Sequence, residues 1–268
     1  MIFNKLLWAI KRHPFLYLTR FRLLSKNSNL DEIARFNYNQ LNPKSRIPNY
    51  FHKVNTEIFP SGRPDSDLET VKQLSAWLNT NIKGGPGLSE PSEKALETML
   101  SGKGGVCSDM AQIFNNFCVI NNLSVREWGT TSAPFNREFG GHSFNEVFIK
   151  ELQKWVLLDV SYTILFYSTE KEPLSVVEVY QLQRSGQVIT YRNFGEGAKV
   201  SEEIINKNYL NQGVTPFLIC HYRNHTYDQF LRYTRPYIPV FMTHFFIYLI
   251  NKSYHYRFPM DDYKRIFS

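Results

Sequence analysis

Cysteine is scarce in this 268-residue chain, which contains only Cys107, Cys118 and Cys220. A small, odd number of cysteines argues against a disulfide framework, and the absence of a CxxC pair removes the common signature of structural zinc. Cys220, His221 and His225 could hold a metal, but no second Cys/His pair completes such a site, so we expect no metal and no other cofactor. A reducing compartment is the simplest interpretation, and we therefore expect a cytoplasmic protein.

Long apolar runs are also missing. The stretch from Tyr237 to Ile250 is apolar over most of its fourteen residues, but it contains Pro239 and His244. A membrane-spanning helix needs about twenty residues. We therefore expect either a buried helix or a segment lying at a membrane interface, and no transmembrane span.

Acidic side chains are absent from the first thirty residues, which hold six Lys/Arg. The apolar stretch within them, Leu6 to Ile10, is too short for a secretory signal. We favour a basic surface helix, with attachment to an anionic membrane surface as the alternative.

Positive charge prevails over the whole chain, with a formal net charge of +7. This balance favours acidic partners, and acidic glycans and anionic membrane surfaces remain candidates. No nucleic-acid-binding motif or long Lys/Arg block is present, so we expect no nucleic-acid partner. Arg223, Arg232, Arg235 and Arg257 are interleaved with tyrosines and could contact an anionic chain, although such side chains more often lie along apolar surface.

The first clear helix signal begins at Ser66, which forms an S-x-x-E capping box with Glu69. Apolar residues at helical spacing follow as far as Ile82, and a glycine- and proline-containing stretch ends the pattern. A second helix is expected over residues 90–100, with Ser89 as its cap.

A glycine-rich loop at residues 102–105 directly precedes Cys107, which begins an amphipathic pattern that ends at Asn121. The hydrophobic period then changes to that of strands. We predict strands over 123–131, 142–149 and 155–160, and a further helix over 174–184. Helices followed by a run of antiparallel strands indicate the α+β class, with the helix that carries Cys107 packed on an antiparallel sheet.

A hairpin between the second and third strands would bring His142 near Asp159. If Ile149 pairs with Leu152, the two residues lie directly opposite each other and share a face, with Cβ atoms about 5 Å apart. A turn one or two residues longer makes Asp159 a near-diagonal neighbour of His142.

Cys107, His142 and Asp159 are the predicted catalytic residues. A helix N-terminus stabilises a thiolate, which is the nucleophilic form of cysteine. His142 would accept the thiol proton and later protonate a leaving amine, and Asp159 would orient the imidazole. Asp109 lies in the same helical turn as Cys107, and we interpret it as a first-turn acid rather than a catalytic group.

Three stretches resemble the transglutaminase-like superfamily. Residues 102–114, G-K-G-G-V-C-S-D-M-A-Q-I-F, resemble its nucleophile segment. Residues 141–147, G-H-S-F-N-E-V, resemble its histidine strand, and residues 155–159, W-V-L-L-D, resemble its acid strand. All three occur in the family's order, and the resemblance covers roughly residues 65–165.

The resemblance implies a papain-like fold and a cysteine-dependent amide hydrolase or acyl transferase that works through a thioester. A peptide or amide substrate is implied, with hydrolysis favoured over cross-linking, and we expect no calcium. The alternative is a catalytically retired module that serves as a binding or membrane-surface scaffold. We divide the chain into a basic N-terminal extension (1–64), a catalytic core (65–165) and an aromatic, basic C-terminal extension (166–268).

Overall fold

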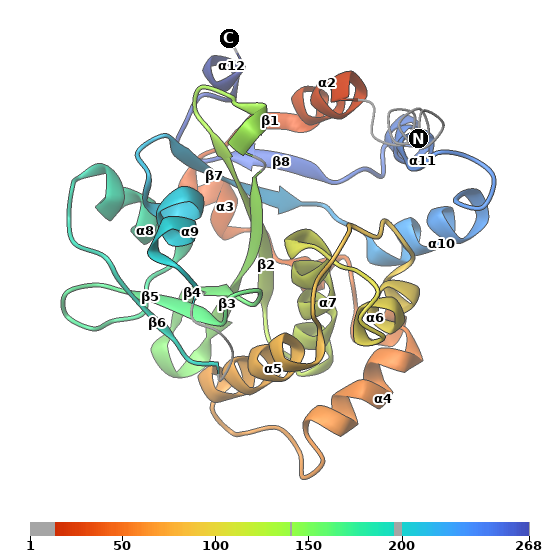
Figure 1. The fold of residues 1–268 in the computed structure, drawn as a ribbon, viewed down its shortest axis with the longest axis horizontal. Helices are drawn as coiled ribbons and strands as arrows, with labels where there is room; N and C mark the ends of the chain where they lie inside the picture. Colours follow the sequence, from red (N-terminus) through yellow and green to blue (C-terminus); the bar gives the residue numbers. More distant parts are fainter. Residues whose placement is uncertain (1–13, 140, 196–199, 268) are drawn as a thin grey trace.

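A single mixed sheet runs through the computed structural model, which describes residues 14–139, 141–195 and 200–267 (Figure 1). Within these residues the strands lie in the order β1-β8-β7-β2-β3-β4-β5-β6. They are β1 (Ser25–Asn27), β2 (Val125–Ser132), β3 (His142–Ile149), β4 (Lys154–Asp159), β5 (Ile164–Tyr167), β6 (Thr190–Asn193), β7 (Val214–Cys220) and β8 (His255–Phe258). Neighbouring strands are antiparallel except β1 and β8, which run parallel near one edge.

The helices are spread over the whole described chain. They are α2 (Pro14–Leu24), α3 (Leu30–Ala34), α4 (Asn49–Ile58), α5 (Asp67–Asn81), α6 (Ser92–Leu100), α7 (Cys107–Ile120), α8 (Val176–Arg184), α9 (Glu202–Ile205), α10 (Asn224–Thr234), α11 (Val240–Leu249) and α12 (Tyr263–Ile266). A short π-helical turn, η5 (Asn206–Leu210), follows α9. Four of these helices, α5 to α8, and the strands β2 to β4 fall within two residues of the predicted elements.

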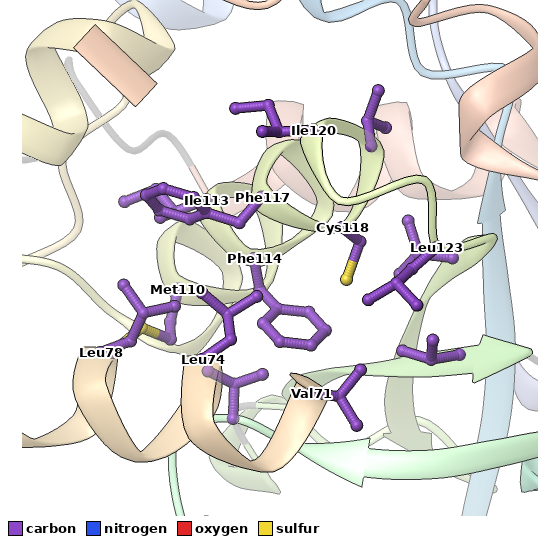
Figure 2. Packing of buried hydrophobic residues seen from close by; sticks show 14 of the residues in the cluster. Val71, Leu74, Leu78, Met110, Ile113, Phe114, Phe117, Cys118, Ile120 and Leu123 are labelled. Atoms are coloured by element: carbon purple, nitrogen blue, oxygen red, sulfur yellow. The ribbon is translucent and has the colours of Figure 1, made fainter. Parts of the chain in front are cut away.

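Helix α7 packs against the sheet at β2 and β3, which confirms the predicted α+β class with the cysteine-bearing helix on an antiparallel sheet. Phe114 of α7 points toward Val71 and Leu74 of α5 (Figure 2), and the Phe117 ring lies 5.1 Å from that of Phe51 of α4. The apolar side chains of α7 recur every three or four residues, so they lie on one face of the helix.

The sheet is buried on both faces, because alternate residues of each central strand enter different cores. Val147 and Ile149 of β3 join the core beneath α5, α6 and α7. Phe144 of the same strand joins a second core with Val176 and Val179 of α8. His142 shares the face of Phe144, since side chains two apart point the same way along a strand.

Two predicted helix caps need correction. Ser66 does accept a hydrogen bond from Glu69 N, but the Glu69 carboxylate pairs with Lys72. The Glu151 carboxylate accepts from Ser66 Oγ and from Leu68 N. A carboxylate from another part of the chain thus satisfies backbone N–H at the start of α5.

The cap predicted at Ser89 is also wrong, because Ser89 has a positive φ of 49° and lies three residues before α6 begins. Pro91 is the N-cap residue of that helix. Asp228 of α10 accepts hydrogen bonds from Ser92 N at 2.7 Å and from Ser92 Oγ at 2.6 Å. A backbone N–H at the start of α6 therefore donates to a carboxylate that is distant in the sequence.

The apolar stretch 237–250 contains α11. Of the two expected alternatives, the buried helix is wrong, because only Thr243 and Ile247 of α11 are buried, and the interfacial segment stays a prediction. No helix among the described residues is long and apolar enough to span a membrane. The expected basic helix at the N-terminus lies partly outside the described residues, which begin at Pro14. The division into a core and two extensions stays a prediction.

Candidate active site

Two glycine turns position the start of α7. Gly85 N donates to Gly105 O at 2.8 Å, and Gly105 N donates to Pro86 O at 2.9 Å. The backbones approach so closely that a Cβ on Gly104, where φ is +156°, would lie 2.9 Å from Pro86 O. Only glycine fits this contact without a shift, so the glycine-rich loop serves to place Cys107 at the first turn of α7.

Asp109 links the same two segments. One carboxylate oxygen accepts from Val106 N at 3.0 Å and from Leu88 N at 3.2 Å. This agrees with the interpretation of Asp109 as an acid of the first helical turn, and it adds a contact that holds the loop before α6 against α7.

His142 and Asp159 lie on the two strands of one hairpin. The turn of this hairpin is too long for the two residues to pair directly. Ile149 pairs with Lys154 rather than Leu152, because residues 150–152 form a 3-10 turn and Gln153 adopts φ 51°. Continued by one pair, this register sets Asp159 opposite Phe144, which makes it a diagonal neighbour of His142 on the same face. His142 Nε2 and Asp159 Oδ2 lie 2.7 Å apart.

The Asp159 carboxylate is fully buried and makes four hydrogen bonds. Oδ2 contacts His142 Nε2 and accepts from the Tyr209 hydroxyl at 2.5 Å. Oδ1 accepts from Ser161 N at 2.8 Å and from Tyr162 N at 3.2 Å. A buried carboxylate is tolerated when its lone pairs are satisfied in this way, and the bonds fix its orientation toward His142.

Aromatic rings surround the imidazole of His142. Tyr162 stacks on it with ring centroids 5.2 Å apart and an interplanar angle of 20°, and Phe144 lies nearly parallel at 6.2 Å. Tyr209 presents its ring at 5.7 Å and 80°. The sequence analysis missed Tyr162 and Tyr209. Tyr162 could have been suspected from its place three residues after Asp159, whereas nothing local marks Tyr209.

Cys107 and His142 perturb each other's ionisation. Burial raises the pKa of the Cys107 thiol, but the hydrogen bond and charge of His142, with a hydrogen bond from the Ser143 backbone, outweigh it and leave that pKa below its ordinary value. Burial lowers the pKa of His142, but Asp159 and Cys107 more than offset this and raise it to about 10. Since His142 Nε2 faces Asp159, Nδ1 is the nitrogen available to the thiol. The arrangement favours the thiolate form of Cys107 beside a protonated His142.

The thiol pKa is raised, not lowered, at the other two cysteines. Cys118 is fully buried in the core between α5 and α7, where burial raises its thiol pKa well above the ordinary value (Figure 2). Burial likewise raises the pKa of Cys220 in β7 to about 11. Cys107 is therefore the one cysteine of the three whose thiol pKa is lowered.

A second buried acid lies between α7 and the sheet. Glu127 of β2 accepts from Asn115 Nδ2 at 3.0 Å, and Asn115 in turn accepts from Asn145 of β3 at 2.8 Å. Burial raises the pKa of Glu127 to about 8; the Asn115 bond lowers it, and the charges of Cys107 and Asp109 raise it further. Glu127 is thus mostly protonated at neutral pH.

Two other residues of the predicted motifs, Glu146 and Trp155, contact side chains that belong to the framework of the sheet. Glu146 accepts from Trp128 Nε1 at 3.0 Å, from Arg126 Nη1 at 3.2 Å and from Val176 N at 2.9 Å, so it joins β2 to the start of α8. The Arg126 guanidinium lies 3.7 Å from the centre of the Trp155 ring. These motif residues hold the strands together around the site.

The weakly supported metal site at Cys220, His221 and His225 is not assembled. His221 lies in the turn before α10 with φ 62°, so it does not share a helix with His225. Among the described residues, no group of three or more His, Cys, Asp or Glu side chains is arranged to hold a metal ion.

Comparison with known proteins supports the resemblance. Residues 54–160 match the family model described as the transglutaminase-like superfamily, and the match includes all three predicted catalytic positions. No curated protein matches the chain. A solved structure of a provisionally assigned cysteine protease from Cytophaga hutchinsonii overlaps with a TM-score of 0.34 and 20% identity, covering 45% of this chain and 40% of that one. This chain thus spans less than half the length of that protein, and so low a TM-score supports no inference about function.

Proposed function

Because residues 54–160 match the family model of the transglutaminase-like superfamily, we propose that the protein is a cysteine-dependent amide hydrolase or acyl transferase that works through a thioester on Cys107. The observation that carries the proposal is the position of His142, which hydrogen-bonds Cys107 on one side and Asp159 on the other. A peptide or another amide is the proposed substrate.

The first half-reaction begins with the thiolate–imidazolium pair. The Cys107 sulfur attacks the amide carbonyl carbon and forms an S–C bond, and the carbonyl oxygen becomes an oxyanion. The Cys107 backbone N–H, at the start of α7, is a candidate donor to that oxyanion. His142 then gives its proton to the departing nitrogen as the C–N bond breaks, which releases an amine and leaves a thioester and a neutral imidazole.

The second half-reaction reverses the proton transfer. His142 takes a proton from water or from a primary amine while the oxygen or nitrogen attacks the thioester carbon. The C–S bond breaks, the thiolate–imidazolium pair is restored, and a carboxylic acid or a new amide leaves. We favour water, because transfer requires an amine-bearing partner to be bound as well.

The test is the pH dependence of iodoacetamide labelling at Cys107. In the unaltered protein we expect rapid labelling that persists well below pH 8.5, the ordinary pKa of a cysteine thiol. His142→Ala removes the imidazole hydrogen bond and charge that lower the Cys107 pKa. It leaves the burial that raises this pKa, opposed only by the Ser143 backbone hydrogen bond, so the profile should move to higher pH. His225→Ala, at an exposed histidine of α10, is the matched control and should leave the profile unchanged.

Cys107→Ala reports background labelling from Cys118 and Cys220, which are buried and have raised pKa values. An activated thiol would justify assays of amine release from glutamine-containing peptides and of incorporation of a fluorescent primary amine. A labelling profile typical of an ordinary thiol, and the same in His142→Ala as in the unaltered protein, would overturn the proposal. It would favour a catalytically retired module that serves as a binding scaffold.

A further inference from the structure

Helix α11 has an apolar surface that the rest of the described protein does not cover. Tyr237 is 85% exposed, Leu249 61% and Phe245 55%, and Phe246, Tyr248 and Ile250 are also exposed. These six residues are here called the α11 face. Among the described residues, more than half of the exposed large hydrophobic side chains fall between Tyr233 and Ile250. Contiguous exposed apolar surface of this kind marks an interaction site.

The polarity of α11 is the reverse of that of an ordinary surface helix. Its two polar residues, Thr243 and His244, face the protein: Thr243 is buried and hydrogen-bonds Thr234 at 2.5 Å, and the His244 ring packs against Tyr227 with centroids 5.6 Å apart. Burial and the charge of Arg20 hold the pKa of His244 well below its ordinary value, so it is neutral at physiological pH. The outward side of the helix therefore carries aromatic and aliphatic groups without charge.

Two segments of the chain beside this face carry positive charge and no acidic residue. The sequence has no Asp or Glu between Asp228 and Asp261, and none before Asp31. The structure brings these two acid-free segments together, because the Arg20 guanidinium of α2 lies 5.2 Å from the centre of the Tyr254 ring, just beyond α11. Figure 1 shows α2 and α11 at the same end of the molecule. Arg235 pairs with Glu90 and is not counted here, but Arg20 and Lys252 remain beside the face.

We propose that the α11 face docks on an anionic lipid bilayer, with α11 lying in the plane of the interface. Ten residues of helix are about 15 Å long, half the thickness of the hydrocarbon core, so α11 can lie in the interface but cannot span it. Tyrosines at the ends of the apolar stretch, such as Tyr237, suit the headgroup region. Arg20 and Lys252 would contact the lipid phosphates.

A second copy of the chain is the competing occupant, and charge argues against it. A two-fold interface through α11 would bring the same patch of each copy together. Arg20 and Lys252 of one copy would then approach those of the other, whereas an anionic membrane supplies the opposite charge.

Flotation of the full chain with phosphatidylcholine vesicles, with and without about 30% phosphatidylserine, tests the proposal. We expect binding to the phosphatidylserine vesicles that weakens as salt rises. The double substitution Phe245→Glu and Leu249→Glu should reduce binding by at least about tenfold, since both side chains lie on the outward side of α11 and would have to bury charge. Lys252→Ala should reduce it by about fivefold, and only on the anionic vesicles.

Val188→Glu is the matched control, because Val188 is exposed and apolar but lies between α8 and β6. It should bind as the unaltered chain does, and so should Cys107→Ala, because docking does not depend on the proposed chemistry. The result that overturns the proposal is absence of binding to phosphatidylserine vesicles, or binding that salt does not weaken. Sedimentation showing a dimer that Phe245→Glu dissociates, without vesicle binding, would assign the face to a second copy.

Discussion

Replacement of Tyr209 by Phe removes one hydroxyl from the buried surroundings of Asp159 and little else. The ring stays in its aromatic cluster, where its centroid is 4.8 Å from that of Phe166 and 5.1 Å from that of Phe144. The lost hydroxyl donates to Asp159 Oδ2, and both residues are fully buried, so no water replaces it. A hydrogen bond to a buried charged group contributes about 1.5–3 kcal/mol, so we expect the free energy of unfolding to fall by about 2 kcal/mol.

In a chain of this size that loss corresponds to a decrease in Tm of about 4–8 °C. Tyr180→Phe is the matched control, because Tyr180 belongs to the same core and is equally buried, and its hydroxyl has no hydrogen-bond partner among the residues that the structure describes. It should be neutral or slightly stabilising, since it removes an unsatisfied polar atom. Urea denaturation of both variants checks the prediction. Equal losses in the two would mean that the hydroxyl of Tyr209 contributes nothing through Asp159.

The same bond predicts coupling between Tyr209 and His142, because both contact Oδ2 of Asp159. Either substitution alone leaves that oxygen with one partner, whereas Tyr209→Phe combined with His142→Ala leaves it with none. The double variant should therefore lose more stability than the two single losses added together, by at least about 0.5 kcal/mol. Strict additivity would show that the two contacts do not share one acceptor.

The remaining predictions concern two glutamates. The folded-state pKa of Glu127 is about 8 against an ordinary 4.5, so the folded chain binds an extra proton between these values and its unfolding free energy falls as pH rises through that window. Glu127→Gln should remove up to about 1.4 kcal/mol per pH unit of that slope in urea denaturation between pH 5 and pH 8, and an unchanged slope would contradict it. Glu151→Ala should lower the free energy of unfolding by about 1 kcal/mol, because it removes the acceptor at the start of α5. Glu69→Ala, which changes the acid expected from the sequence, should lower it by less than half as much in the same assay. A larger loss for Glu69→Ala than for Glu151→Ala would contradict the role of Glu151.

The sequence was informative about the site where the relevant signals are local. Cys107 follows its glycine loop directly, and His142 and Asp159 lie on strands joined by one short turn, so spacing and period were enough to predict their proximity. Of the turn lengths considered for this hairpin, the one two residues longer forms. The sequence did not select it, because Gln153 adopts a left-handed conformation at a position without glycine or asparagine.

The contacts that were not predicted join distant parts of the chain. Tyr209 lies 50 residues after Asp159, and Glu151 lies 85 residues after Ser66. Such partners are set by tertiary packing, and neither has a flanking pattern that distinguishes it from other tyrosines or glutamates. For a related reason the sequence left open whether the apolar stretch 237–250 is buried or exposed: apolar composition does not show whether the protein provides a surface that covers it.

The order of the strands bears on how the protein can be produced and studied. Residues 54–160 contain β2, β3 and β4, which occupy the middle of the sheet. In the whole chain β7 covers one side of this group along six residue pairs of β2, and β5 covers the other at β4. In a fragment cut to those limits, β2 and β4 would become edge strands with unpaired backbone N–H and C=O groups, which can pair with strands of other molecules. We therefore expect the excised segment to aggregate on expression, and the full chain to be the form suited to labelling, titration and vesicle experiments.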